Sequence, residues 1–243
     1  MGTIIFNKKS SRDFGLEVET FPTYDIPERV FTKVEVPGRN GEVIFDTGAY
    51  KNARRSYKVS LATYDEESYS VKMNQIAEWL HSTSGYARLE DSYDEDFFRY
   101  AYYSGAISIE NIFNEAGRAT LDFECKPQRY YKNGEIPIEF ISNGKIQNKT
   151  PFASLPIIDV YIGGNQAQST VTIGSYGFTV LANSGTHIII DSELQDAYYG
   201  TENKNHCISF GNRNFPKLLP GLSNVSFTGD IYKIEITPKW WTI

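Results

Sequence analysis

The acidic cluster at residues 91–96 is the first place where this sequence could carry out chemistry. It contains Asp91, Asp94, Glu95 and Asp96. Paired carboxylates are what glycoside hydrolysis needs, and carboxylate oxygens are the ligands that calcium prefers. The cluster lacks the D-x-D-x-D-G spacing of a calcium loop, and neighbouring acids in a strand or loop rarely converge on one bond of a substrate. We therefore predict a solvated loop here, without a metal or a catalytic role.

The histidines and cysteines offer no reactive pair either. His206 and Cys207 are adjacent, but neighbouring side chains in a strand point to opposite faces, so the imidazole could not activate the thiol. His187 could reach Cys207 only through the tertiary fold. The chain also lacks zinc-ligand spacing, a nucleophile elbow, a P-loop and a dinucleotide-binding glycine motif. We therefore predict a protein that is not an enzyme and binds no cofactor.

A second group of residues is better suited to interfaces. We expect three arginines on or near exposed turns, where their planar guanidinium groups could make several oriented hydrogen bonds to a partner. Consecutive Trp240 and Trp241 should face opposite ways, one into the core and the other outward or against a partner; a packing role for both stays open. The candidate interface residues are Gly38, Arg39, Asn40, Gly41, Arg54, Arg55 and Trp241.

Composition narrows the class of protein. The 243 residues carry a net charge of −6 and form no local basic patch, which argues against specific nucleic-acid binding. No apolar stretch approaches the ~20 residues of a membrane span, and no signal peptide is visible, so we expect no membrane insertion. The two cysteines do not form a disulfide framework, which favours synthesis in a reducing compartment.

The stretch at residues 121–131 predicts the boundary between two domains. Leu121, Phe123 and Cys125 alternate with polar residues, as in a strand with one buried face. Pro127 lacks a backbone N–H, so we expect strand pairing to end there. The predicted domains are residues 1–131 and residues 132–243.

The first domain reads as α+β and the second as a β-sandwich. In the first, residues 30–46 predict a hairpin that turns at Asn40-Gly41 in a type I′ conformation, and apolar spacing predicts a helix over residues 68–83. The remaining strands are expected at residues 4–6, 14–18, 56–62, 87–89, 97–103 and 106–112. In the second domain, seven short strands predict the sandwich: residues 157–162, 170–173, 178–181, 186–191, 208–210, 225–228 and 232–237.

Seven segments, in order along the chain, resemble the distal tail (Dit) proteins of long-tailed phages, or prophages, of Gram-positive bacteria. The first half contributes VEVPGRNGE (34–42), AEWLHSTSGYARLEDSYD (77–94), GAISIENIF (105–113) and ATLDFECKPQRY (119–130). The second half contributes PFASLPIIDVYIGG (151–164), IIIDSELQDAYY (188–199) and NFPKLLPGLSNVSFTGDIYKIEITPKWWTI (214–243).

This resemblance implies a structural protein of the virion, at the tail tip or baseplate of a siphophage. The first domain would be a belt that assembles into a hexameric ring, singly or as stacked rings. The second would be a galectin-like β-sandwich outside the ring. The implied partners are the tail tube protein, the tail-associated (Tal) protein and a receptor-binding protein that serves host adsorption, and DNA would cross the central channel. Assembly would take place in the host cytoplasm.

Two other classes of function stay open from the residues alone. The first is a carbohydrate-binding module whose sandwich contacts cell-wall glycans, with Trp241 as a stacking platform. The second is a wall-degrading enzyme that uses the cluster at residues 91–96. The chain has no room for the large carbohydrate-binding insertions of some Dit proteins, so the resemblance implies the compact form.

Overall fold

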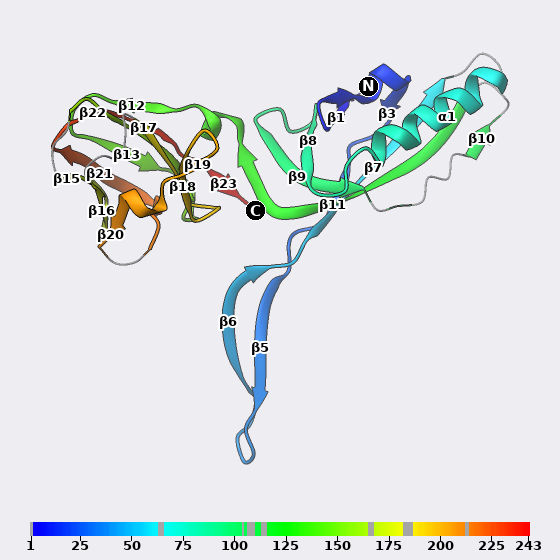
Figure 1. Ribbon diagram of the computed structural model, residues 1–243. Helices are drawn as coiled ribbons and strands as arrows, with labels where there is room; N and C mark the ends of the chain where they lie inside the picture. Colours follow the sequence, from blue (N-terminus) through cyan, green and yellow to red (C-terminus); the bar gives the residue numbers. More distant parts are fainter. Residues whose placement is uncertain are drawn as a thin grey trace. The chain divides into compact units, whose positions relative to one another are not determined.

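The computed structural model describes residues 2–62, 66–103, 105, 110–112, 116–164, 168–181, 187–211 and 214–243. The chain divides into two compact units (Figure 1): Met1–Arg129 together with Ile243, and Tyr130–Thr242. Among the described residues there is one α-helix, and the remaining regular structure is almost entirely antiparallel strand. The predicted class, mainly β with one helix in the first domain, is confirmed.

The first unit is built on a large antiparallel sheet. Its central path runs β2-β1-β8-β9-β11-β7-β3, with β10 added to β11 and β4 added to β7. The strands are β1 (Ile4–Phe6), β2 (Lys9–Ser10), β3 (Leu16–Val18), β4 (Thr23–Tyr24), β7 (Ala53–Ala62), β8 (Ala87–Asp91), β9 (Phe97–Tyr103), β10 (Glu110–Ile112) and β11 (Ala116–Tyr131). The strand predicted at residues 106–112 is described only from Glu110; residues 106–109 lie outside the described part.

Helix α1 (Glu66–Leu80) covers the buried face of this sheet. Ile76, Trp79 and Leu80 are buried among the apolar side chains of the strands. The indole of Trp79 stacks on Phe14 with ring centroids 4.8 Å apart, and its Nε1 donates a hydrogen bond to the carbonyl oxygen of Phe6 at 3.0 Å. The predicted amphipathic helix is therefore confirmed, with both ends shifted toward the N-terminus.

The predicted hairpin is present, but its turn differs from the prediction. Strands β5 (Arg29–Glu35) and β6 (Glu42–Tyr50) pair in register from Glu35 opposite Glu42. The connection therefore spans residues 36–41, and positive φ occurs at Gly38 and Gly41 but not at Asn40. A type I′ turn needs positive φ at both central residues, so the predicted turn at Asn40-Gly41 is wrong. That conformation instead occurs at Asn7 and Lys8, between β1 and β2.

The prediction that Pro127 ends the strand is also wrong in part. The ladder between β11 and β7 does end at Cys125 opposite Ala53, before the proline. The backbone nevertheless remains extended to Tyr131, because a proline is compatible with strand geometry wherever its missing N–H is not required by a neighbour. Strand β11 thus continues from the first unit into the second.

The second unit consists of two antiparallel sheets. One has the order β12-β22-β14-β17-β18-β19 and the other β13-β21-β15-β16-β20. Their strands are β12 (Ile138–Phe140), β13 (Gly144–Asn148), β14 (Ile157–Ile162), β15 (Gln168–Ile173), β16 (Tyr176–Leu181), β17 (His187–Asp191), β18 (Asp196–Tyr199), β19 (Glu202–Asn203), β20 (Ile208–Phe210), β21 (Gly221–Thr228) and β22 (Ile231–Thr237), and β23 (Trp241–Thr242) follows.

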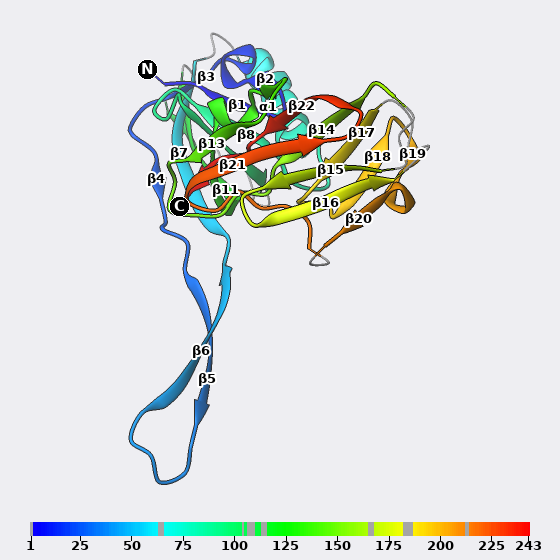
Figure 2. The same cartoon turned by 90° about the vertical axis from the view of Figure 1, so that its left-hand side faces the viewer.

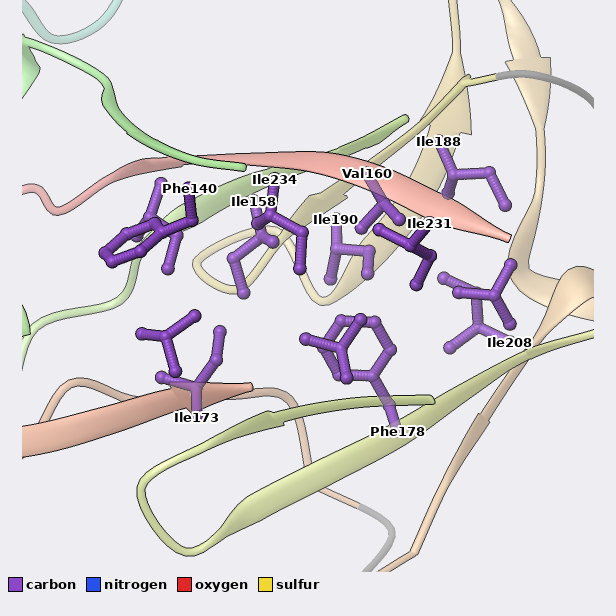
Figure 3. Packing of buried hydrophobic residues seen from close by; sticks show 14 of the residues in the cluster. Phe140, Ile158, Val160, Ile173, Phe178, Ile188, Ile190, Ile208, Ile231 and Ile234 are labelled. Carbon is purple, nitrogen blue, oxygen red and sulfur yellow. The ribbon is translucent and has the colours of Figure 1, made fainter. Parts of the chain in front are cut away.

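The core of the second unit lies between its two sheets, as expected for a sandwich (Figure 3). Ile158, Val160 and Ile234 come from one sheet and face Ile173 and Phe178 of the other. All seven predicted strands are present, β14 and β20 with the predicted bounds and the other five with adjusted ends; Thr186 lies outside the described residues. Strands β12, β13, β18 and β19 were not predicted, since each is short and lacks a clear apolar alternation.

We predict that Trp79→Ala destabilises the first unit by about 3–5 kcal/mol, because it empties a large buried site and leaves the Phe6 carbonyl without its donor. Urea unfolding followed by far-ultraviolet circular dichroism measures the change. Val71→Ala is the matched control on the same helix, since Val71 is 52% exposed and should change stability by less than about 0.5 kcal/mol. Equal effects of the two substitutions would contradict the packing described here.

Candidate functional site

The β5–β6 hairpin of the first unit carries several exposed apolar side chains. It extends beyond the other strands of that unit in both views (Figures 1 and 2) and pairs with no third strand among the described residues. Five of its large apolar side chains are between 41% and 59% exposed: Phe31, Val34, Val36, Ile44 and Phe45. A protein does not usually leave such a ribbon in water without a partner, because an isolated hairpin is only marginally stable.

Strand alternation gives this hairpin two different faces. On one face Val34 lies opposite Val43 and Thr32 lies opposite Phe45, so this face is almost wholly apolar. The other face carries the pairs Lys33 with Ile44, Glu35 with Glu42 and Phe31 with Asp46, and is largely charged. We call the first of these the apolar face of the hairpin. It is suited to packing against another protein surface.

The base and the tip of the hairpin differ in their side-chain contacts. At the base, Arg29 forms an ion pair with Asp46 and lies 5.7 Å from the ring centroid of Tyr50. The Gly48 backbone N–H and Arg29 hold the pKa of Asp46 below its ordinary value. At the tip, a Cβ placed on Gly38 or Gly41 would meet no atom within 4 Å. The tip residues Gly38, Arg39, Asn40 and Gly41 are all exposed.

The two arginines of β7 lie in opposite environments. Arg54 is exposed on the sheet and pairs with Asp122 of β11. Arg55 is only 2% exposed, so the expectation that it lies on an exposed turn is wrong. The period-two alternation of β7 explains the difference, because it turns Arg55 to the same buried face as Tyr57. As the structure stands, only Arg54 can contact a partner directly.

Arg55 belongs to a buried polar network with Asp91 and Tyr57. Its Nε donates to Asp91 Oδ2 at 2.9 Å and to the Tyr57 hydroxyl at 2.7 Å, and its Nη2 lies 2.7 Å from the same carboxylate oxygen. The Tyr57 hydroxyl also donates to Asp91, at 2.7 Å. Burial, together with the charge of Asp91, raises the pKa of Tyr57 well above its ordinary value. The network is a structural element inside the first unit.

The acidic cluster is therefore not simply a solvated loop. Glu95 and Asp96 are exposed as predicted, whereas Asp91 is buried against Arg55. Asp94 pairs with Arg99 at 3.0 Å and with Arg129 at 2.6 Å. The sequence could not indicate these pairs, because the arginines come from β7, β9 and β11. Among the described residues, no group of three or more potential ligands is placed to hold a metal ion.

The adjacent His206 and Cys207 differ in exposure. His206 is exposed and Cys207 is buried, both within a short 3-10 turn, Asn205–Cys207, that precedes the strand predicted at residues 208–210. His187 instead lies 2.9 Å from Asp159, measured from Nε2 to Oδ1. Burial raises the pKa of the Cys125 thiol to about 12, which disfavours the reactive thiolate.

Trp241 is held within the second unit. Its ring stacks on Phe152 with centroids 4.3 Å apart, and its Nε1 donates to the carbonyl oxygen of Ala153 at 2.9 Å. Trp240 packs against the core of the same unit. Both tryptophans are partly buried, so Trp241 offers less than a whole ring to a partner.

A row of four rings crosses the outer face of the six-stranded sheet and was not predicted. Tyr232, Tyr161, His187 and Tyr199 follow one another with centroid separations of 6.2, 4.3 and 4.9 Å. The ammonium of Lys233 lies 4.0 Å from the centre of the Tyr161 ring. These residues are far apart in sequence, and only the order of the strands brings them together.

Two comparisons with known proteins concern the family and the fold of this chain. Residues 9–125 match the family model of the phage tail protein RIFT-related domain. The structure is similar over 100% of both chains to the Dit protein (gp 19.1) of phage SPP1, with a TM-score of 0.74 and 12% sequence identity. That structure is described as a paradigm of the hub adsorption apparatus in phages that infect Gram-positive bacteria.

Two structures of the phage P2 baseplate in its activated conformation are similar as well. The one with Ca has a TM-score of 0.53 at 11% identity over 97% of both chains. The one with Sr has a TM-score of 0.52 at 11% identity, over 97% of this chain and 96% of the other. None of the curated protein sequences matches this chain.

These matches confirm the predicted likeness to Dit proteins in fold. The matched domain model and the similar structures are those of phage tails and baseplates. Within the described part of the chain, no helix has the length and apolar character to cross a membrane.

We predict that Asp94 stabilises the first unit at neutral pH and loses this effect in acid. Burial alone would raise the pKa of Asp94, but the Arg129 hydrogen bond and the charges of Arg99 and Arg129 hold it below its ordinary value. A carboxyl with a lowered folded-state pKa contributes fully above its ordinary pKa of about 4, and the contribution disappears as pH falls through the folded pKa.

Asp94→Asn should therefore cost about 1–3 kcal/mol at pH 7 and much less near pH 3. Urea unfolding at both pH values, followed by tryptophan fluorescence in a Trp240→Phe, Trp241→Phe background that leaves Trp79 as the single reporter, measures the difference. Asp96→Asn is the control, because Asp96 is exposed in the same turn. A loss that is the same at pH 3 and pH 7 would show that the ionised carboxylate is not responsible.

Proposed function

We propose that this chain, whose fold is similar to that of a Dit protein, is a Dit-like phage tail protein and forms a hexameric ring at the tail tip through its first unit. The protein is a structural component of the tail tip or baseplate of the virion. The observation that supports ring formation is the exposed apolar face of the β5–β6 hairpin. A neighbouring copy of the chain would bury Val34, Val43 and Phe45 and so gain the free energy of removing them from water.

Contact through the hairpin favours a ring of copies. The hairpin is unlike the rest of the surface of its unit, so contact between the hairpin of one copy and another surface of the next copy would be head-to-tail. Head-to-tail contacts close into a ring when the rotation between copies permits it. In this arrangement the tip residues Gly38, Arg39, Asn40 and Gly41 contact the neighbour, and the exposed Arg54 supplies an oriented charge.

The ring would join three further components of the tail. The tail tube protein binds one side of it and the tail-associated (Tal) protein binds the other. The second unit docks the receptor-binding protein that recognises the host, and Trp241 lies at that surface. DNA passes through the channel without being held, and the net charge of −6 agrees with such passage because it gives phosphates no general attraction.

Glycan binding by the second unit is the other candidate function. Trp241 is less suited to it than the sequence indicated, because Phe152 already occupies one face of its ring. The aromatic row of Tyr232, Tyr161, His187 and Tyr199 is the observation that favours it. Rings beside carboxylates such as Asp159 and Glu235 would combine stacking with hydrogen bonds to sugar hydroxyls.

The ring predicts a particle of about 166 kDa, six times the chain mass of 27.6 kDa, or a multiple of it. Phe45→Asp, on the apolar face, should weaken assembly tenfold or more, because it would bury an unpaired charge in the contact. Light scattering on a sizing column measures the mass across a range of protein concentrations. Ile44→Asp is the control, since it places the same charge on the opposite face of the same strand.

If Phe45→Asp and Ile44→Asp shift the mass equally, the apolar face is not the contact. A wild-type protein that stays at 27.6 kDa at every concentration would contradict ring formation by the isolated chain.

For the second candidate, Tyr199→Ala should reduce binding to purified Gram-positive cell-wall fragments at least fivefold, because Tyr199 ends the aromatic row and is 49% exposed. A pull-down assay with quantified bound protein measures this. Leu222→Ala is the control, an exposed residue of the other sheet. Absence of wall binding by the wild-type protein would exclude this function.

A further inference from the structure

The first unit contains a basic pocket that the ring does not explain. It has a volume of about 150 Å³, enough for several water molecules at about 30 Å³ each. Five basic side chains line it: Arg54, Arg55, Arg99, Lys126 and Arg129. The lining includes a single acidic side chain, Asp25.

The carboxylates around this pocket do not satisfy all of its guanidinium groups. Asp91 engages Nε and Nη2 of Arg55, but Arg55 Nη1 is buried and has no hydrogen-bond partner among the described residues. Asp94 engages Nη2 of Arg129, but Arg129 Nε is likewise buried and unpaired. A buried donor without an acceptor is costly, and two of them on one pocket point to an acceptor supplied from outside.

The side chains that line the pocket are mostly basic. Five basic side chains stand against the single acidic side chain of Asp25, and Ile243 lines the pocket as well. Burial and the charge of Arg55 lower the pKa of Arg99, so positive charges are crowded here. An anion would relieve that crowding.

We propose that this pocket binds an oxyanion, a phosphate or carboxylate group, between Arg129 and Arg55. The two chemistries share the oxygen geometry that a guanidinium group recognises. Arg129 lies at the more accessible position, with its side chain 30% exposed, and the ring of Phe97 covers one face of it at 3.6 Å. Arg55 lies deeper, with the Tyr24 ring 4.9 Å from its guanidinium carbon.

Tyr24 controls access to the deeper arginine. It lies in the two-residue strand β4, which is paired only to the edge of β7, and its side chain is 54% exposed. Moving this ring would open Arg55 Nη1 to the pocket without disturbing the core. An occupied site therefore has the Tyr24 ring displaced from Arg55.

The experiment is a calorimetric titration of the full chain with inorganic phosphate, at constant ionic strength set with sodium chloride. Wild-type protein should bind one phosphate per chain with millimolar or better affinity. Arg129→Gln should weaken binding at least tenfold, and Tyr24→Ala should strengthen it at least threefold by exposing Arg55. The control, Arg118→Gln, removes an exposed arginine of the same strand outside the pocket and should leave the affinity unchanged.

Three results would overturn the proposal: no phosphate binding by the wild-type protein, equal losses in Arg129→Gln and Arg118→Gln, or weaker binding in Tyr24→Ala. Circular dichroism of each variant verifies that it is folded. The outcome for the monomer does not depend on ring assembly.

A second arm of the same titration separates the two sources of the oxyanion and rests on the proposed ring. Phosphate binding retained in the assembled fraction identifies a free anion as the ligand. Phosphate binding lost on assembly, but present in the monomer, identifies a carboxylate side chain from a second copy.

Discussion

The antiparallel ladder between β7 and β11 is the interaction on which the first unit depends. It contains ten residue pairs, from Ala116 with Ala62 to Cys125 with Ala53, and so pairs the whole of β7 with the first part of β11. Its buried face presents Tyr57, Leu121 and Phe123 to the helix and the other strands of the core. The ladder also positions arginines that line the basic pocket, because Arg54 and Arg55 lie on β7 and Arg129 lies on β11 beyond the ladder.

The first unit buries some charged groups and exposes some apolar groups, and the two cases are stabilised differently. Inside, charged groups are buried and are compensated by pairing, as in the contact of Arg55 with Asp91. On the hairpin, apolar groups are exposed and remain uncompensated within one chain. Of these two features, only the exposed apolar groups point to a partner, because a monomeric protein rarely leaves such a patch in water.

Local patterns predicted the elements well and the contacts poorly. The strands predicted at residues 97–103 and 157–162 have the same bounds as β9 and β14. The turn near Asn40 was mispredicted because the connection is six residues long and uses Gly38 and Gly41. The burial of Arg55 and the aromatic row of the second unit were beyond prediction, since each depends on strands far apart in sequence lying side by side.

The register of the hairpin also affects its tendency to aggregate. Each of its two edges carries unpaired backbone groups, and such edges promote uncontrolled strand addition and fibre formation. Near the tip, Glu35 stands directly opposite Glu42, and Lys33 lies within 3.3 Å of Glu42. A third strand pairing there would have to desolvate these charges, while Pro37 offers no N–H to a new ladder. The hairpin is thereby protected against aggregation along its edges and left free to associate through its face.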